Sequence, residues 1–275
     1  MSTRVDVGYR HLVPRIDLAE RPGVGIDGLP RPTEDRIVIT SDTAVVLDGA
    51  TELRRGLPSG GWYSRLLAEK IEDRLRAHPS EDLGVLLAES IGDVAGEQGL
   101  TPRHAPSSTV AMLRWSADHV EALVLADSPV VAFTAKGPDV VHDDRLDKLR
   151  AAGALRTRSE VDRLRNSEGG FWVAEAVPEA ASQALRRRWP RDTVEAVVLA
   201  TDGVSVGVDT YGVLDWPSLL RLCRTDGAEA VLDAVRKAEA EDSECRRWPR
   251  SKRHDDQALI LIDFSDDQGT IRDDP

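Results

Sequence analysis

The feature of this sequence that most constrains its fold is a series of short segments that are apolar at nearly every position. They are rich in valine, isoleucine and leucine, which is typical of β-strands. Several are apolar without interruption, as expected of strands whose two faces are both covered. We predict strands over residues 36–40, 44–47, 108–114, 120–125, 130–134, 195–200 and 258–262.

Between these segments lie stretches with the three- and four-residue apolar spacing of amphipathic helices. We predict helices near residues 62–75, 83–94, 178–188 and 228–238. Ser59 is a candidate cap for the first helix, and Gly99 a candidate end for the second. The strands come mostly in adjacent pairs, and two helices follow the first pair. This order favours an α/β sandwich of two antiparallel sheets flanked by helices over regular βαβ alternation.

The 275 residues fit a single large domain, whose core we expect over about residues 31–264. The Pro/Gly-rich stretch 21–32 is expected to be a loop, and the part before it a peripheral strand or an arm. Residues 142–170 are charged and lack a clear strand pattern. We therefore predict a flap or an insertion there.

Charge and cysteine content exclude several classes of function. The net charge is -12, from 48 acidic and 36 basic residues, which argues against binding nucleic acid. A phosphorylated substrate stays possible, because bound cations can reverse the local field. Two cysteines are too few for a thiolate metal site or a disulfide framework. No apolar run is long enough to span a membrane and the start lacks a signal peptide, so we expect a cytoplasmic protein; its oligomeric state is not predicted.

Acidic residues recur at the ends of the predicted strands. Three strands end in an aspartate beside glycine or serine, and two acidic pairs directly precede strands. These residues are Asp48, Asp127 and Asp202, with the pairs Glu34-Asp35 and Asp255-Asp256. Carboxylates at the rim of an apolar sheet are costly unless something compensates their charge. A divalent cation would do so, and oxygen ligands without histidine or cysteine favour Mg²⁺ or Mn²⁺ over zinc.

Asp-Gly is also a common turn dipeptide, so a single occurrence carries little information. Asp27-Gly28 lies in the Pro/Gly-rich stretch and Asp226-Gly227 opens a predicted helix, and we interpret both as turns. The signal is the ordered set, in which Asp48-Gly49 and Asp202-Gly203 each follow a strongly apolar strand.

The ordered set resembles the 2C-type (PPM) metal-dependent protein serine/threonine phosphatases, with the features of a bacterial-type member. The resemblance covers residues 31–264 and rests on six motifs in the family's order. They are TED at 33–35, LDGA at 47–50, SSTVAML at 107–113, LADSPVV at 125–131, ATDGV at 200–204 and HDDQALILI at 254–262. The family hydrolyses phosphomonoesters with a metal-activated water, most often on phosphoserine or phosphothreonine of proteins.

The resemblance implies a role for each acidic residue. Asp48 would bridge two Mn²⁺ or Mg²⁺ ions, and Asp202 and Asp255 would complete one of the two sites. These three aspartates are the implied catalytic residues. The carbonyl oxygen of Gly49 would serve the second ion.

Further carboxylates complete the implied set. Glu34 and Asp35 would hold waters bound to the metals, and Asp127 would help to bind a third ion. Two ions close together lower the pKa of a bridging water and hold an in-line displacement at phosphorus.

The chain also departs from the family pattern. Ala50 stands where the family often has a histidine that can act as a general acid, and Ala126 replaces the glycine of the Gly-Asp-Ser turn. The family's phosphate-binding arginine falls on Pro30, so Arg31, one residue later, is the candidate for substrate binding. Two alternatives stay open: a phosphatase of a small phosphorylated metabolite, and a catalytically weak relative that acts as a binding or regulatory module.

Two basic stretches and one histidine are interpreted without a functional role. The run 246–253, just before Asp255, is expected to be a solvated loop, although it could attract a phosphorylated or acidic partner. Residues 186–188 with Arg191 are expected at the polar end of a helix. His254 is expected to lie incidentally at the surface.

Overall fold

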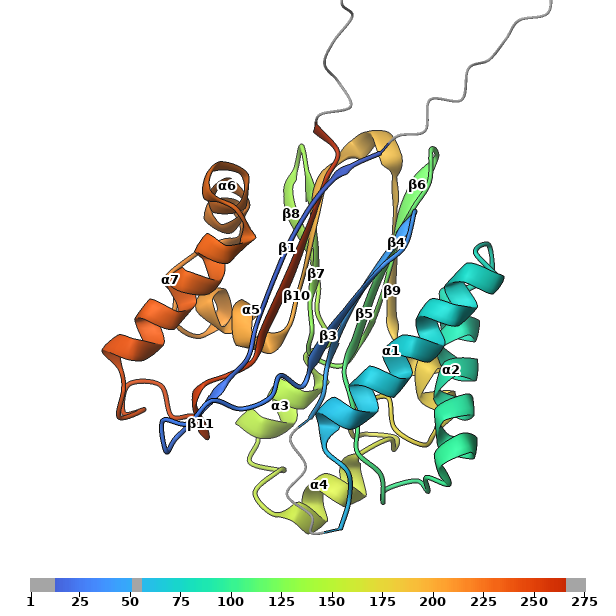
Figure 1. The fold of residues 1–275 in the computed structure, drawn as a ribbon, viewed down its shortest axis with the longest axis vertical. Helices are drawn as coiled ribbons and strands as arrows, with labels where there is room; N and C mark the ends of the chain where they lie inside the picture. The colour runs from blue at the N-terminus through green and yellow to red at the C-terminus, as the bar shows by residue number, and fades with distance from the viewer. Residues whose placement is uncertain (1–12, 51–55, 266–275) are drawn as a thin grey trace, which may run out of the picture.

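A computed structural model describes residues 13–50 and 56–265, and in it two five-stranded sheets pack face to face between layers of helices (Figure 1). Sheet one has the order β1 (Arg15–Arg21), β12 (Gln257–Asp263), β10 (Val194–Ala200), β7 (Val130–Thr134) and β8 (Gly137–Val141). Sheet two has the order β3 (Asp35–Ile39), β4 (Thr43–Asp48), β5 (Val110–Trp115), β6 (His119–Leu125) and β9 (Leu185–Pro190). Neighbouring strands are antiparallel throughout both sheets. A small ribbon pairs β2 (Val24–Gly25) with β11 (Lys252–His254).

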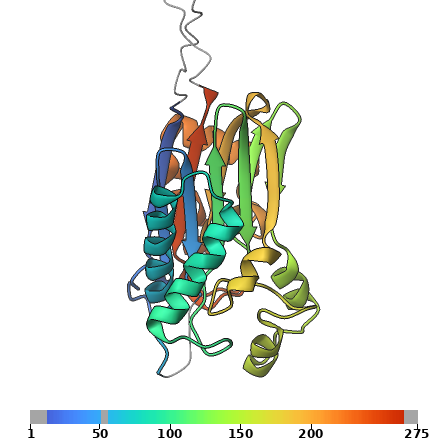
Figure 2. The same cartoon turned by 90° about the vertical axis from the view of Figure 1, so that its right-hand side faces the viewer.

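Helices cover both outer faces of the sandwich. The helices α1 (Gly60–Ala77) and α2 (Leu83–Gln98) lie across sheet two, as Figure 2 shows. On sheet one pack α5 (Asp202–Asp209), α6 (Trp216–Asp226) and α7 (Ala228–Glu241). Two short helices, α3 (Arg145–Ala151) and α4 (Arg158–Leu164), stand at one end of the sandwich (Figure 1). The predicted sandwich of two antiparallel sheets flanked by helices is confirmed.

The uninterrupted apolar strands have apolar neighbours on both faces. In β4, Val45 and Leu47 pack beneath α1 and α2, whereas Ala44 and Val46 pack between the two sheets. In β12, Leu259 faces the helices on the other side of the molecule. Alternate side chains therefore enter two different cores, and the period-two polar pattern of a half-exposed strand disappears.

The ends of the first two helices follow the predicted signals. The side chain of Ser59 caps α1, because it accepts a 3.1 Å hydrogen bond from the Trp62 amide. Asp82 caps α2 in the same way. Gly99 ends α2 with a left-handed backbone, φ 62°. The predicted helix near 228–238 is also present, as α7.

The predicted helix over 178–188 is wrong. A short 3₁₀-helix, Pro178–Gln183, is followed by strand β9, which pairs with β6 at the edge of sheet two. Arg186, Arg187 and Arg188 therefore lie in an exposed edge strand, where Asp82 binds Arg186 and Asp139 binds Arg187. Long-range pairing with β6 overrides the local helix preference of this alanine- and arginine-rich segment.

Other parts of the chain add elements that the sequence patterns left open. The part before the first loop includes an edge strand, β1, and residues 142–170 contain α3 and α4. Cys223 and Cys245 are both unpaired, and burial raises the pKa of the Cys223 thiol to about 12. None of the helices in the described ranges combines the length and apolarity needed to cross a membrane.

Candidate metal centre

The acidic residues singled out in the sequence meet at one end of the sandwich, the lower end in Figure 1. Antiparallel pairing causes this, because β3 begins where β4 ends and β12 begins where β10 ends. Sheet two contributes Asp35, the first residue of β3, and Asp48, the last residue of β4. Sheet one contributes Asp202, the first residue of α5, which follows β10, and Asp255 in the turn before β12.

Asp35 occupies the centre of this end and links the two sheets. It lies directly opposite Asp48 in the register of β3 and β4. Its Oδ2 accepts a 2.9 Å hydrogen bond from the hydroxyl of Thr201, which follows β10 in the other sheet. Its Oδ1 is buried and has no hydrogen-bond partner among the described residues. A buried carboxylate oxygen without a partner is costly, so this atom is available to a cation or to a water.

Two glycines allow the chain segments at this end to approach each other. A Cβ on Gly203 would lie 1.8 Å from the carbonyl oxygen of Asp256, so only glycine lets α5 start against the turn before β12. A Cβ on Gly49 would lie 2.5 Å from the carbonyl carbon of Gly60 at the start of α1. The amide of Gly49 donates to the carbonyl of Glu34 at 3.1 Å. The glycines after Asp48 and Asp202 are therefore needed for close packing.

Burial and mutual repulsion raise the pKa values of the clustered carboxyls. Burial is the largest cause at Asp35, Asp48 and Asp202, and the neighbouring aspartates raise the pKa of each further above its usual value. The side chains of Asp48 and Asp202 also share a hydrogen bond. Burial raises the pKa of Asp127, although Arg150, 3.3 Å from its Oδ2, opposes the shift. The cluster thus contains more carboxyl groups than the cations beside it can pair with.

Lys252, which the sequence analysis placed in the basic run 246–253, reaches into this cluster. Its Nζ lies 2.6 Å from Asp255 Oδ1, 3.2 Å from Asp256 Oδ2 and 3.9 Å from Glu34 Oε2. The expectation of a solvated loop is therefore wrong for this part of the basic run. The signal available in the sequence was a lysine three residues before a proposed metal ligand.

Two other residues near the cluster are more buried than expected. The Arg250 side chain, 13% exposed, pairs with Asp242 at 2.8 Å. His254 Nδ1 lies 2.7 Å from Glu239 Oε2, and the buried Glu239 also accepts from the Tyr211 hydroxyl at 3.2 Å. The interpretation of His254 as incidental surface is wrong, since this pair ties the segment before Asp255 to α7.

Arg31 stands beside the cluster but contacts a different acid. Its guanidinium pairs with Asp27 at 2.7 Å, and half of its side chain is exposed. It lines a cavity of about 820 Å³ together with Glu34, Trp62 and Lys252. Asp27-Gly28 forms a turn, with Gly28 at φ 78°, as the sequence predicted. Asp226 ends α6 and Gly227 precedes α7.

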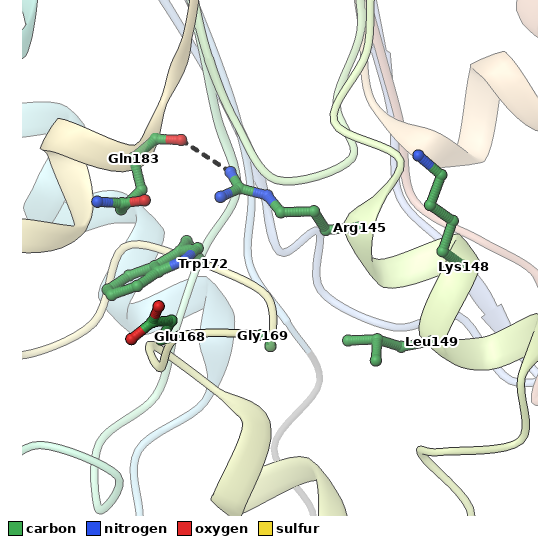
Figure 3. Close-up of a pocket in the computed structure, with 8 residues that line it drawn as sticks. Arg145, Lys148, Leu149, Glu168, Gly169, Trp172 and Gln183 are labelled. Atoms are coloured by element: carbon green, nitrogen blue, oxygen red, sulfur yellow. Dashed lines mark hydrogen bonds between the residues drawn. The ribbon is translucent and has the colours of Figure 1, made fainter.

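Two further cavities lie near this end of the molecule. One of about 190 Å³ is bordered by Asp127, Asp202, Asp255 and Lys252. The other, of about 610 Å³, lies between α3 and the loop that carries Trp172 (Figure 3). It contains none of the clustered carboxylates. In it the Arg145 guanidinium donates to the Gln183 carbonyl at 2.8 Å. Because the clustered carboxylates line only the other two cavities, the candidate metal chemistry lies there.

The donor set fits a hard divalent cation, although its side chains are not yet arranged around one. Within residues 13–50 and 56–265, no three acidic, histidine or cysteine side chains are grouped as a ready-made chelator. Asp48 is turned to Asp202, and Asp255 to Lys252. The donors are nevertheless all carboxylate or carbonyl oxygens, which Mg²⁺ and Mn²⁺ prefer. The unpartnered Oδ1 of Asp35 and the surplus of carboxyl groups over cations also favour a bound cation.

No known family profile matches the chain, and no curated protein matches it in sequence. Its fold, however, is that of bacterial serine/threonine phosphatases. The catalytic domain of PstP, in complex with two manganese ions, has a TM-score of 0.58 at 11% identity, with 90% of this chain and 97% of that chain covered. The Mycobacterium tuberculosis phosphatase PstP/Ppp gives 0.57 at 12% identity, with 92% and 99% covered. Staphylococcus aureus Stp1 gives 0.57 at 13% identity, with 96% and 98% covered. These PPM-type structures confirm the resemblance at the level of the fold.

Proposed function

We propose that this chain, which has the fold of PPM-type phosphatases, hydrolyses phosphomonoesters with the help of Mn²⁺ or Mg²⁺. Its substrate on this proposal is phosphoserine or phosphothreonine in a protein. The observation that carries the proposal is the convergence of carboxylates from both sheets at one end of the sandwich, around the unpartnered Oδ1 of Asp35. Such a concentration of poorly neutralised acids marks functional sites more often than structural ones.

The proposed ligand roles follow from where the carboxylates lie. Asp48, Asp202 and Asp255 would hold one ion, and Asp48 with the Gly49 carbonyl would hold the second. Bound Mn²⁺ or Mg²⁺ would supply a water of lowered pKa and would neutralise charge on the phosphoryl group.

Three more acidic residues would complete the centre. Glu34 and Asp35 would hold waters next to the ions, and Asp127 would contribute to a third site. The hydroxyl of Thr201 would hold Asp35 in place, since it donates to the carboxylate oxygen that faces sheet one.

Arg31 is the proposed contact to the substrate phosphate. It lines the 820 Å³ cavity beside Glu34, and a guanidinium binds two phosphate oxygens at once. The Arg31→Ala variant should raise KM for a phosphorylated substrate and leave Mn²⁺ affinity nearly unchanged. An unchanged KM would remove Arg31 from the site.

The central experiment measures metal-dependent hydrolysis. Purified protein should hydrolyse p-nitrophenyl phosphate with Mn²⁺ or Mg²⁺ and lose this activity in EDTA. Full activity after exhaustive chelation would refute the mechanism. A phosphoserine peptide and a panel of small phosphorylated metabolites, compared by kcat/KM, would separate the protein phosphatase from the metabolite phosphatase.

One observation favours a second candidate, a binding or regulatory module without turnover. Lys252 occupies two of the acids in the cluster, and Ala50 has no proton to donate to a leaving group. The module predicts no hydrolysis with any divalent metal, together with retained binding of a phosphorylated peptide. Binding of that peptide to protein that is inactive with Mn²⁺, Mg²⁺ and Co²⁺ would favour this candidate.

A further inference from the structure

The position of Lys252 is fixed by its surroundings. It begins β11, where it pairs with Gly25 of β2, a strand more than two hundred residues earlier in the chain. Two residues before it, Arg250 donates to the carbonyls of Arg253, Glu239 and Asp242. Only 21% of the Lys252 side chain is exposed. The protein therefore directs this ammonium into the cluster.

The charges around Lys252 are those of the proposed metal centre. Asp255 and Asp256 both lie within 3.2 Å of the Lys252 ammonium, and Glu34 lies 3.9 Å from it. Its closest partner, Asp255 Oδ1, is an oxygen that a metal ion would need. An ammonium and a divalent cation at this oxygen compete, because they share its lone pairs and repel one another at short range.

Lys252 differs from the other cations that line the 820 Å³ cavity in what it contacts. Arg31 pairs with Asp27, and Arg65 pairs with Glu69 at 2.7 Å, both outside the cluster. Arg36 donates to the backbone carbonyls of Thr33 and Asp35. Among the described cations that line the 820 Å³ cavity, Lys252 alone pairs with carboxylates of the cluster.

Lys252 also borders both cavities at this end of the sandwich. It lines the 190 Å³ cavity with Asp127, Asp202 and Asp255, and the 820 Å³ cavity with Arg31 and Glu34. A lysine side chain has four flexible carbon–carbon bonds, so its ammonium can move between these cavities while the backbone of β11 stays in place.

We infer that Lys252 is a resident counter-ion that exchanges partners. Without metal its ammonium holds Asp255 and Asp256, and when metal ions take Asp255 the released ammonium contacts the phosphoryl oxygens of the substrate. The inference rests on the proposed function for its second half, whereas its first half concerns metal binding alone. It assigns to β11 a phosphate contact that the family pattern places elsewhere in the chain.

The test uses one substitution with two opposite expected effects. Lys252→Met removes the competing charge, so calorimetric titration of the metal-free protein should show Mn²⁺ binding at least about tenfold more tightly than in the wild type. The same variant, loaded with Mn²⁺, should bind inorganic phosphate about tenfold more weakly. If Lys252 were merely structural, the substitution would weaken the binding of both Mn²⁺ and phosphate, or of neither.

Two further variants serve as controls. Arg246→Gln removes one positive charge from the same basic run, but Arg246 is 83% exposed and pairs with Glu244, so both affinities should stay at wild-type values. Lys252→Arg keeps the charge and should keep the weak Mn²⁺ binding. Lys252→Gln repeats the test if the methionine variant does not fold, as judged by circular dichroism.

Each outcome decides for or against the inference. Unchanged or weaker Mn²⁺ binding in Lys252→Met overturns it, as does Mn²⁺ binding in Lys252→Arg that equals that of Lys252→Met. No Mn²⁺ binding in any variant also overturns it. If Lys252→Met binds Mn²⁺ more tightly than the wild type, the counter-ion role is supported. If, in addition, neither the wild type nor Lys252→Met hydrolyses p-nitrophenyl phosphate, the proposed hydrolase is refuted.

Discussion

The hydroxyl of Thr201 offers a stringent test of how the two sheets are joined at the candidate site. It donates to Asp35 Oδ2 at 2.9 Å and accepts from the Ala258 amide at 2.9 Å. All three residues are completely buried. Valine has nearly the shape of threonine but can neither donate nor accept, so Thr201→Val removes both hydrogen bonds while the packing stays nearly unchanged.

The expected cost follows from the two groups left behind. The Ala258 amide would be buried without an acceptor, which costs about 1–3 kcal/mol. Asp35 would lose its hydrogen bond to Thr201, worth about 1 kcal/mol if the carboxyl is neutral, and more if it is charged. Burial raises the pKa of Asp35, so we use the lower value for the metal-free protein. The free energy of unfolding should therefore fall by about 2–4 kcal/mol.

Urea denaturation at pH 7 in EDTA measures this change, with Thr201→Ser as the matched control. Serine keeps the hydroxyl and should lose only the packing of one methyl group, about 1 kcal/mol. A Thr201→Val protein within about 0.5 kcal/mol of the wild type, at the same m-value, would refute the reasoning. It would mean that water replaces both bonds at this buried position.

Other measurements test other parts of the molecule. Asp48→Asn should abolish metal-dependent hydrolysis, whereas Asp27→Asn should keep most of it; equal losses with folding intact would show that the wrong Asp-Gly turn was chosen. In EDTA the free energy of unfolding should fall as the pH rises from about 4, because clustered carboxyls of raised pKa keep protons in the folded protein that the unfolded chain has released. Urea denaturation at pH 5 and pH 8 checks the sign, and greater stability at pH 8 would contradict it. Iodoacetamide at pH 8 should modify Cys245 in the native protein and spare buried Cys223, whose pKa is raised to about 12; mass spectrometry reads the sites, and equal rates would contradict the burial. Ala126→Gly should change the free energy of unfolding by less than about 1 kcal/mol. Glycine relieves the left-handed backbone at φ 70°, but the variant loses a buried methyl group and gains freedom in the unfolded chain. A thermal melt that shows a larger loss of stability would mean that the packing of the methyl group dominates.

The strands and the acidic cluster could be predicted because both depend on local sequence. An apolar run such as the one ending at Leu47 must be buried, whichever segments pack against it. An aspartate directly after it, such as Asp48, must then lie at the end of a strand. The order of strands and helices favoured two sheets, and the resemblance to the phosphatase family implied that the carboxylates share one metal centre.

What could not be predicted depends on pairing between distant segments. Residues 185–190 have the composition of a helix, and only the register with β6 makes them a strand. Lys252 lies in a basic run that looks solvated, and only its pairing with Gly25 turns its side chain to Asp255. Neither pairing produces a periodic pattern of apolar residues in the sequence, because β9 and β11 are short.

The arginines of β9 have a consequence for how copies of this protein meet at high concentration. As the outer strand of sheet two, β9 uses one side of its backbone to pair with β6. A second molecule that added its own β9 there would bring Arg186, Arg187 and Arg188 of both copies to within about 5 Å of one another. Asp82 and Asp139 pair with Arg186 and Arg187 within each molecule, so the repulsion is strongest at Arg188. Together with the crowding of these long charged side chains, it opposes growth of the sheet from one molecule into the next. We therefore expect the arginines of this edge strand to disfavour aggregation of the folded protein.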